Sequence, residues 1–203
     1  MTSQVLDEVG FDRLTTSMVA EGAGVAIGTL YRYFPDRIVL LKALHDREIR
    51  RLQDRIVDQL ASAPVSEIWQ AVDVAVTVFV DMFRNEPGFR IVRFVDVKRE
   101  PPMERDDPQV GYIARWLAEV LSKTFQIAID AELIFNLEVV VQTTGALVHH
   151  AFVLTPGGDP RFIRKARAIN RLHLEEAYGS GSGSGSGSIC ARRNGSTTRL
   201  PDQ

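Results

Sequence analysis

Side chains suited to nucleic-acid contacts occur between Thr15 and Leu44, in the run TTSMVAEGAGVAIGTLYRYFPDRIVLLKAL. We predict two short helices here, because Thr15 can cap the first, Gly22–Gly24 can end it, and Phe34-Pro35 ends the second. The second helix, residues 27–33, offers hydroxyls, a guanidinium and a bare backbone. These groups suit contacts with phosphates and base edges in a DNA major groove, and they come from Gly28, Thr29, Tyr31, Arg32 and Tyr33.

The same segment is also compatible with a generic helical hairpin that carries a surface tyrosine. The second helix is too short to stand alone, so packing against neighbouring helices must hold it. The apolar residues expected to do so are Val19, Val25, Leu30 and Phe34. Chemistry alone leaves the two interpretations open.

The run AGVAIGTLYRYFPDRIVLL, residues 23–41, closely resembles the recognition-helix signature of TetR-family repressors. The matching positions are Ala23, Gly24, Val25, Gly28, Thr29, Leu30, Tyr31, Tyr33, Phe34, Leu40 and Leu41. The sequence departs from the family pattern at Ala26-Ile27, where a serine cap and a polar or basic residue are usual.

The resemblance implies specific roles for individual residues in DNA binding. Gly28 would permit close approach to DNA, while Thr29, Tyr31 and Tyr33 would contact phosphates or bases. Arg37 would reach a phosphate from the start of the next helix. The backbone amides near Thr15 and Thr16 would also lie against the phosphate backbone.

Helical periodicity runs through nearly the whole chain, which predicts an all-α fold of about nine helices. We expect a helix-turn-helix DNA-binding domain at 1–45, which residues 191–203 would complete if the tail is a transplanted N-terminus. A larger helical domain for effector binding and dimerisation would follow at 46–178. The remaining parts are a Gly-Ser linker at 179–188 and a tail at 189–203.

Composition excludes several classes of protein. The chain has 203 residues, of which 45% are hydrophobic and 25% charged, and its net charge of -2 argues against non-specific coating of nucleic acid. The single cysteine, Cys190, excludes an internal disulfide framework. Neither a signal peptide nor a membrane-spanning apolar run is evident, so the predicted location is cytoplasmic.

Aromatic residues on successive helices of the second domain could line a ligand cavity, with a few polar residues among them. Core packing is the alternative interpretation for many of these residues individually. The resemblance implies that the ligand would be a small hydrophobic effector. The candidates are Trp69, Phe79, Phe83, Phe94, Trp116, Phe135, Asn136, Gln142 and Thr143.

The predicted helix at 130–154 is apolar on almost every side, so it should meet something beyond its own domain core. The resemblance implies that it forms a four-helix bundle with the last helix and their symmetry mates in a homodimer. The interface residues predicted are Leu147, Val148, Phe162, Ile163, Ala166, Ile169 and Leu172.

The predicted function is that of a repressor which binds a near-palindromic operator and is released by the effector. A helical homodimeric interaction module without DNA binding is the first alternative, and a small enzyme is the second. The four histidines form neither a Glu-x-x-His nor a His-Glu-x-x-His motif. We therefore expect no enzyme activity, no metal and no cofactor.

The strict Gly-Ser alternation at 179–188 is typical of an engineered flexible linker. One hypothesis is that residues 189–203 are a transplanted N-terminus, because joining Gln203 to Thr2 extends the first helix. Arg192 and Arg193 would then add positive charge to the DNA-binding end. The alternative is a tag or a tethered peptide.

Overall fold

The computed structural model describes residues 15–86, 89 and 111–179. Within these ranges the chain forms helices and no strand, which confirms the predicted all-α class. The helices are α2 (Thr16–Ala23), α3 (Ile27–Tyr33), α4 (Arg37–Ser62), α5 (Ile68–Asn85), α7 (Tyr112–Phe125), α8 (Ala131–Leu154) and α9 (Pro160–Tyr178). The first helix and the tail at 189–203, including Arg192 and Arg193, lie outside the described residues.

Side-chain caps explain where several helices begin. In each of these the side-chain oxygen of the residue before the helix accepts a hydrogen bond from a backbone N–H in the first turn. The capping residues are Thr15, Asp36, Asp130 and Asp159, all at predicted helix starts. Hydrogen bonds from the side chain and backbone of Arg161 lower the pKa of Asp159 from 3.8 to about 2.

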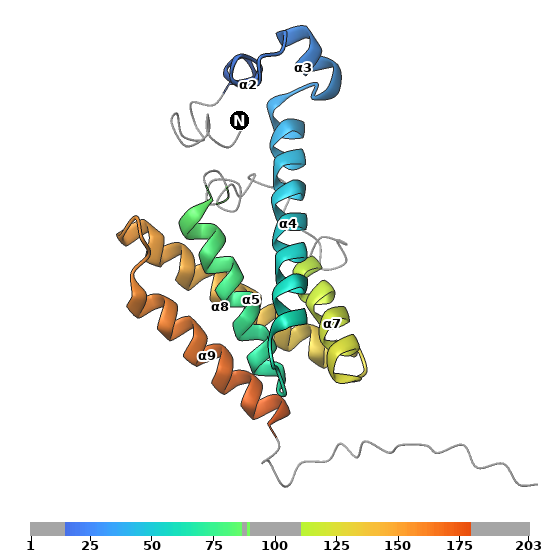
Figure 1. The fold of residues 1–203 in the computed structure, drawn as a ribbon, viewed down its shortest axis with the longest axis vertical. Coiled ribbons are helices and arrows are strands. Elements are labelled where there is room, and N and C mark those ends of the chain that lie inside the picture. The colour runs from blue at the N-terminus through green and yellow to red at the C-terminus, as the bar shows by residue number, and fades with distance from the viewer. Residues whose placement is uncertain (1–14, 87–88, 90–110, 180–203) are drawn as a thin grey trace, which may run out of the picture.

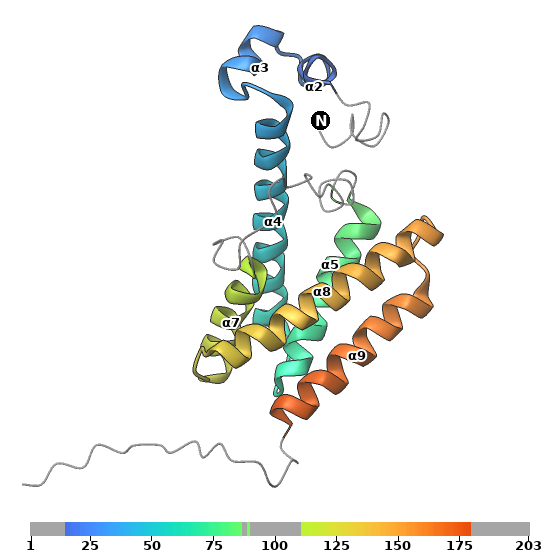
Figure 2. The ribbon, with the colours of Figure 1, turned by 180° about the vertical axis from the view of Figure 1, so that it is seen from behind.

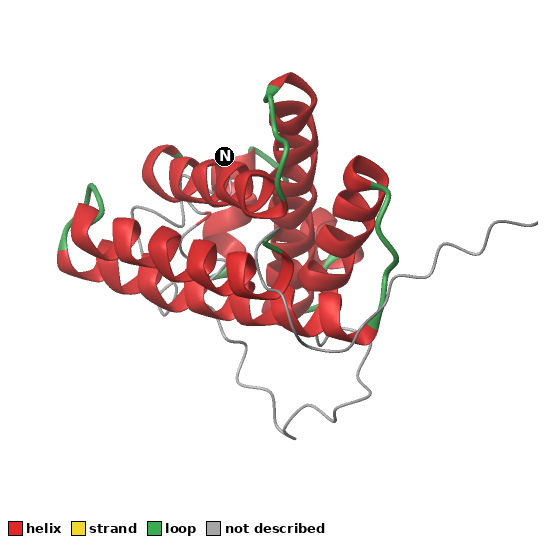
Figure 3. Ribbon diagram, turned by 90° about the horizontal axis from the view of Figure 1, so that it is seen from below, coloured by secondary structure: helices red, strands yellow, loops and turns green. Residues whose placement is uncertain are grey.

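The long helix α4 connects two unequal parts of the molecule. Helices α2 and α3 lie at one end of α4, and α5, α7, α8 and α9 surround its other half (Figures 1 and 2). Helices α8 and α9 run side by side as one layer beneath the others (Figure 3). The position of α3 relative to the larger part therefore depends on α4.

Two hydrophobic cores correspond to the two parts. The smaller core is built from α2, α3 and the first turns of α4, and it consists of Val19, Ala20, Leu30, Leu40, Leu41 and Leu44, with Phe34 packed against it. The larger core joins α4, α5, α7, α8 and α9 and includes Leu52 and Ile56 of α4. Helix α4 is therefore the element that contributes residues to both cores.

Phenylalanines form the centre of the larger core. The ring centroid of Phe83 lies 4.8 Å from that of Phe79, 5.4 Å from that of Phe89 and 5.3 Å from that of Phe152. The exposed fraction of Phe83 is 1%. Such tilted and edge-on ring pairs are stabilising, so Phe83 is a packing residue.

Helix α8 is unusually apolar for a helix on the outside of a bundle. It is the one helix among the described residues that is long and apolar enough to span a membrane, with a mean hydropathy of 1.3 over its 18-residue window. This differs from the sequence-based expectation that no such run exists. The helix packs against α7 and α9, and a core helix of a soluble protein has the same composition.

Candidate DNA-binding face and effector cavity

A left-handed glycine sets the angle between α2 and α3. Gly24 has φ 66°, a conformation that side chains disfavour, and its N–H points back to the carbonyl oxygens of Ala20 and Glu21. The next residue continues the turn, because the Val25 N–H donates to the Ala20 carbonyl over 3.0 Å. The tight glycine turn predicted between the two helices is confirmed.

Leu30 fixes which side of α3 faces outward. Its exposed fraction is 7%, and it packs in the smaller core. At about 100° per residue, Gly28 and Arg32 then lie on the opposite side of the helix. Tyr31 and Thr29 flank this side, while Ile27 and Tyr33 lie nearer Leu30 around the helix, and all six residues are exposed.

The backbone at Gly28 is bare toward solvent. A Cβ atom placed there would meet nothing within 4 Å. The fold itself therefore leaves room for a side chain at this position. An approaching surface could come closer to the α3 backbone here than at any neighbouring residue.

A hydrogen bond holds the outer ends of α2 and α3 together. The hydroxyls of Thr16 and Tyr31 lie 2.8 Å apart, although Tyr31 remains 46% exposed. Thr15 uses its own hydroxyl to cap α2, accepting from the Met18 N–H over 3.3 Å. Arg37 lies in the first turn of α4. The structure thus brings together these predicted contact residues at one end of the molecule.

Sequence reasoning misplaced Val25 and overlooked its neighbours. Val25 is 41% exposed, so the prediction that it packs against adjacent helices is wrong. Ile27 is 43% exposed, and Ala26 is also exposed. The αL turn at Gly24 directs this segment outward, and an apolar residue type alone does not reveal that. An apolar edge formed by Val25, Ala26 and Ile27 therefore leads into the outward side of α3.

Ion pairs attach α4 to the end of α5. The carboxylate of Glu48, 2% exposed, binds Arg47 and Arg51 of its own helix, at 2.6 Å and 2.8 Å. Arg51 also lies 2.7 Å from Glu86, which a second arginine, Arg55, contacts at 2.5 Å. We call Glu48, Arg51, Arg55 and Glu86 the α4 clamp. Sequence reasoning missed it because its partners lie more than thirty positions apart.

An apolar cavity of about 60 Å³, partly open to solvent, lies between α4, α5, α7 and α8 beside the larger core. Phe79 is the one predicted ligand residue that lines it. The other lining residues are Ile49, Leu52, Ile56, Val72, Ala75, Val76, Ile113, Leu117, Val140, Val141, Thr144 and Gly145. Sequence reasoning missed these because small aliphatic residues carry no signature of a cavity.

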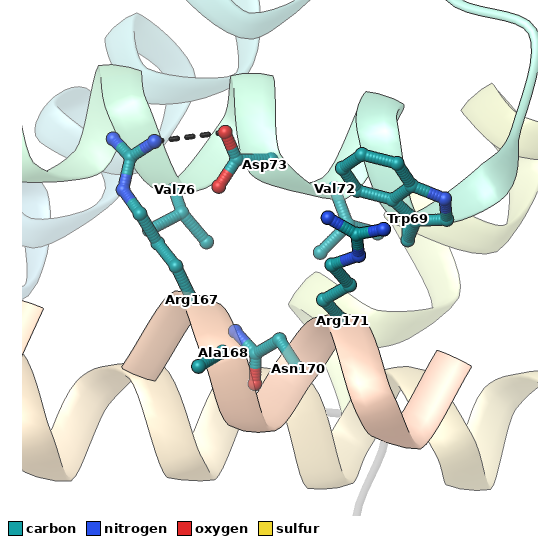
Figure 4. Close-up of a pocket in the computed structure, with 8 residues that line it drawn as sticks. All are labelled: Trp69, Val72, Asp73, Val76, Arg167, Ala168, Asn170 and Arg171. Atoms are coloured by element: carbon teal, nitrogen blue, oxygen red, sulfur yellow. Dashed lines mark hydrogen bonds and ion pairs between the residues drawn. The ribbon is translucent and has the colours of Figure 1, made fainter. Parts of the chain in front are cut away.

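A second, larger hollow of about 310 Å³ lies between α5 and α9 and is open to the surface (Figure 4). The Arg171 guanidinium lies 4.3 Å from the centre of the Trp69 ring at one end of the hollow. Arg167 and Asp73 form an ion pair of 2.8 Å at the other end. Trp69 is therefore a residue of this outer groove, apart from the apolar cavity.

The remaining predicted ligand residues do not converge on one site. Phe135 is 65% exposed, and the exposed Gln142 donates to Glu138 over 2.6 Å, so their placement in an internal pocket is wrong. Asn136 is buried but donates to the Tyr178 hydroxyl over 3.0 Å. Burial raises the pKa of Tyr178 above its ordinary value.

Three further members of the set have no place in either cavity. Phe83 belongs to the aromatic core, Trp116 packs at its edge, and Thr143 is half-buried on α8. Neither hollow includes any of the three among its lining residues. Phe94 lies outside the described residues.

The residues predicted to form the dimer interface differ in how far they are exposed on the single chain. Val148 and Ala166 are completely buried and Ile163 is 8% exposed within the single chain, so their assignment to a partner surface is corrected. Leu172 is 67% exposed, which leaves it available to a partner. The half-buried remainder comprises Leu147, Phe162 and Ile169.

Two family models match the chain. Residues 2–44 match the bacterial regulatory proteins of the tetR family, and residues 66–178 match the tetracyclin repressor-like C-terminal domain. The chain belongs to the TetR family. The resemblance seen around α3 thus extends through the helices of the larger core, and this member is a transcriptional regulator by family.

Solved structures of TetR-family regulators share this fold. A TetR-family transcriptional regulator from Streptomyces coelicolor is 31% identical, with a TM-score of 0.73 over 86% of this chain and 93% of that one. The fatty acid degradation regulator FadR from Bacillus halodurans has a TM-score of 0.62 over 85% of this chain and 94% of its own. At 18% identity, FadR supports the fold alone.

Curated relatives match over shorter stretches. The HTH-type transcriptional regulator SAR0097 of Staphylococcus aureus is 30% identical over 97 residues, 47% of this chain and 50% of that protein. The HTH-type transcriptional repressor KstR of Mycolicibacterium smegmatis is 40% identical over 62 residues, 30% of each chain. The chain therefore spans half the length or less of these relatives.

Replacing Glu86 tests the α4 clamp. Glu86→Gln leaves Arg51 and Arg55 facing a neutral amide, and we expect the free energy of unfolding to fall by about 1 to 2 kcal/mol. The loss should shrink at high salt, because both arginines are partly exposed. Urea denaturation at low and high ionic strength measures it.

Asp81→Asn is the matched control, because Asp81 is 54% exposed and lies 3.8 Å from Arg55. We expect this variant to change the free energy of unfolding by no more than about 0.5 kcal/mol. Equal effects of the two substitutions would contradict a clamp centred on Glu86.

Proposed function

We propose that this TetR-family protein is a homodimeric repressor that binds a near-palindromic operator and acts in the cytoplasm. The observation that carries the proposal is the outward side of α3, where exposed hydroxyls and Arg32 surround the bare backbone of Gly28. A helix of this kind fits the major groove, with its first residues at the base edges. Neighbouring Thr15, Thr16 and Arg37 would lie on the phosphate backbone.

Exposed apolar side chains on α8 and α9 support the homodimer. Phe135 and Val153 on α8 are 65% and 64% exposed, and Leu172 on α9 is 67% exposed. Large apolar side chains that are exposed along two adjacent helices are typical of a protein interface. A two-fold axis through this layer would present two α3 helices to successive major grooves, about 34 Å apart.

The apolar cavity between α4, α5, α7 and α8 supports a small hydrophobic effector. Leu52 and Ile56 of α4 line it, so a ligand there would press directly on the helix that carries the DNA-binding part. At about 60 Å³ the cavity is smaller than usual ligand sites, which hold about 300 Å³ or more. An effector must therefore widen it, and the widening would displace α4.

Operator binding is tested with DNA selected from a random duplex pool by the full chain. Thr29→Ala and Tyr31→Ala should each weaken binding to the selected sequence by about 1–3 kcal/mol, measured by fluorescence anisotropy. Lys123→Ala, which removes an exposed cation on α7, is the control and should bind as tightly as the parent. Binding without sequence preference would favour the alternative of an interaction module that does not read DNA.

The dimer is tested by placing a charge on its proposed surface. Leu172→Glu should convert the protein from dimer to monomer in light scattering, because a carboxylate would be buried unpaired at the interface. Val57→Glu changes a valine on α4 that is 47% exposed, and it should leave the dimer intact. A dimer that persists in Leu172→Glu would place the interface elsewhere.

The effector site is tested by filling the cavity. Ala75→Val adds two methyl groups to a buried lining residue and should abolish retention of a co-purified apolar molecule in native mass spectrometry. Ligand-free DNA binding should be unchanged. Gln142→Ala is the control, because the exposed Gln142 lines neither cavity. Ligand retained equally by both variants would exclude this cavity.

A further inference from the structure

The apolar edge of Val25, Ala26 and Ile27 has no role in the DNA contacts described so far. Exposed hydroxyls and a guanidinium elsewhere on α3 can form hydrogen bonds, whereas these three side chains cannot. Ile27 and Val25 are 43% and 41% exposed, in contrast to Leu30, which is 7% exposed in the core. Packing within the described part of the chain therefore does not explain why Val25 and Ile27 are apolar.

The edge lies at the part of α3 that would meet the base pairs. Ile27 is the first residue of the helix, and Ala26 precedes it without a side-chain cap. In a helix-turn-helix protein the N-terminal residues of the recognition helix contact base edges. Ile27 directly precedes Gly28 and is 43% exposed, so a base that approaches the first turn of α3 at the bare backbone could also meet this side chain.

The major groove offers one apolar group to such a side chain. Of the four bases, thymine alone presents a methyl group there, and the other groove-edge groups used for readout are hydrogen-bond donors or acceptors. A donor or acceptor placed against Ile27 would lose its water and gain no partner, which is unfavourable. Burying the thymine methyl group against Ile27 is instead favourable, because both groups are apolar.

We propose that Ile27, with Ala26 beside it, selects a thymine in each operator half-site through the 5-methyl group of that base. The proposal rests on the proposed operator binding and adds one element of its specificity. Arg32 lies more than one turn further along α3, so it would contact a different base pair or a phosphate. Hydrogen bonding and methyl recognition thus come from separate turns of the helix.

The test replaces each thymine of the selected operator, one symmetric pair at a time, with deoxyuridine. This change removes the methyl group and keeps every hydrogen-bonding group of the base. At one symmetric pair, we expect affinity to fall about fourfold for each half-site, the usual effect of one buried methyl group. Fluorescence anisotropy with the full chain measures the difference.

Protein variants show whether Ile27 is the residue responsible. Ile27→Ala should bind thymine and deoxyuridine operators equally at that pair, whereas Ile27→Val should retain part of the preference. Thr29→Ala should weaken binding to both operators while keeping the full preference between them. Circular dichroism of each variant checks that the helices still form, and the exposed position of Ile27 favours normal folding.

The outcomes separate the two proposals. If the full chain selects no sequence from the pool, operator binding itself fails. If it selects an operator but no deoxyuridine replacement weakens binding, methyl recognition is wrong and operator binding stands. A preference that survives in Ile27→Ala also overturns the assignment to Ile27.

Discussion

Arg51 forms ion pairs with two carboxylates. One is that of the buried Glu48 on α4, and the other is that of Glu86, the residue just after α5. The position of α3 depends on this contact, because α4 is the helix shared by the two cores. Glu48 is 2% exposed, and a carboxylate so deeply buried requires its arginines. The charged side of α4 therefore has a defined partner and fixes where α4 lies.

The adjacent side of α4 faces the apolar cavity. Leu52 and Ile56 line that cavity, while Arg51 and Arg55 hold Glu86. Apolar contacts stabilise the side of α4 that lines the cavity, and ion pairs stabilise the side that carries the clamp. If a ligand widened the cavity, it would press on the same two turns of α4 that the clamp holds to Glu86.

The sequence predicted those features that depend on near neighbours. Caps such as Asp36 and Asp130 act on the next three residues, so the helix starts were predictable, and the αL turn at Gly24 follows from glycine chemistry. Leu30 and Val19 were correctly placed inside the smaller core. The family-specific run around α3 allowed the candidate contact residues to be named.

Features that depend on distant packing were not predictable in the same way. Helix α8 is apolar nearly all round, so its sequence does not show that Val148 faces the core and Phe135 faces outward. The same ambiguity misplaced Phe83, whose aromatic neighbours come from α5, α8 and position 89. The clamp residue Glu86 was missed because charge pairs across helices leave no periodic pattern.

The fold does not require glycine at position 28, because the space outside this residue is empty. A partner that approaches the backbone would require it. Alanine would fit there without a clash, and it is a better helix former than glycine, by up to about 1 kcal/mol in a helix interior and less in a first turn such as this one. A library screened for heat resistance alone would therefore accumulate alanine at this position. The resulting proteins would have higher thermal stability, but the added methyl group would keep a DNA duplex further from the α3 backbone. Selection for thermal stability and selection for DNA binding would therefore favour different residues at this position.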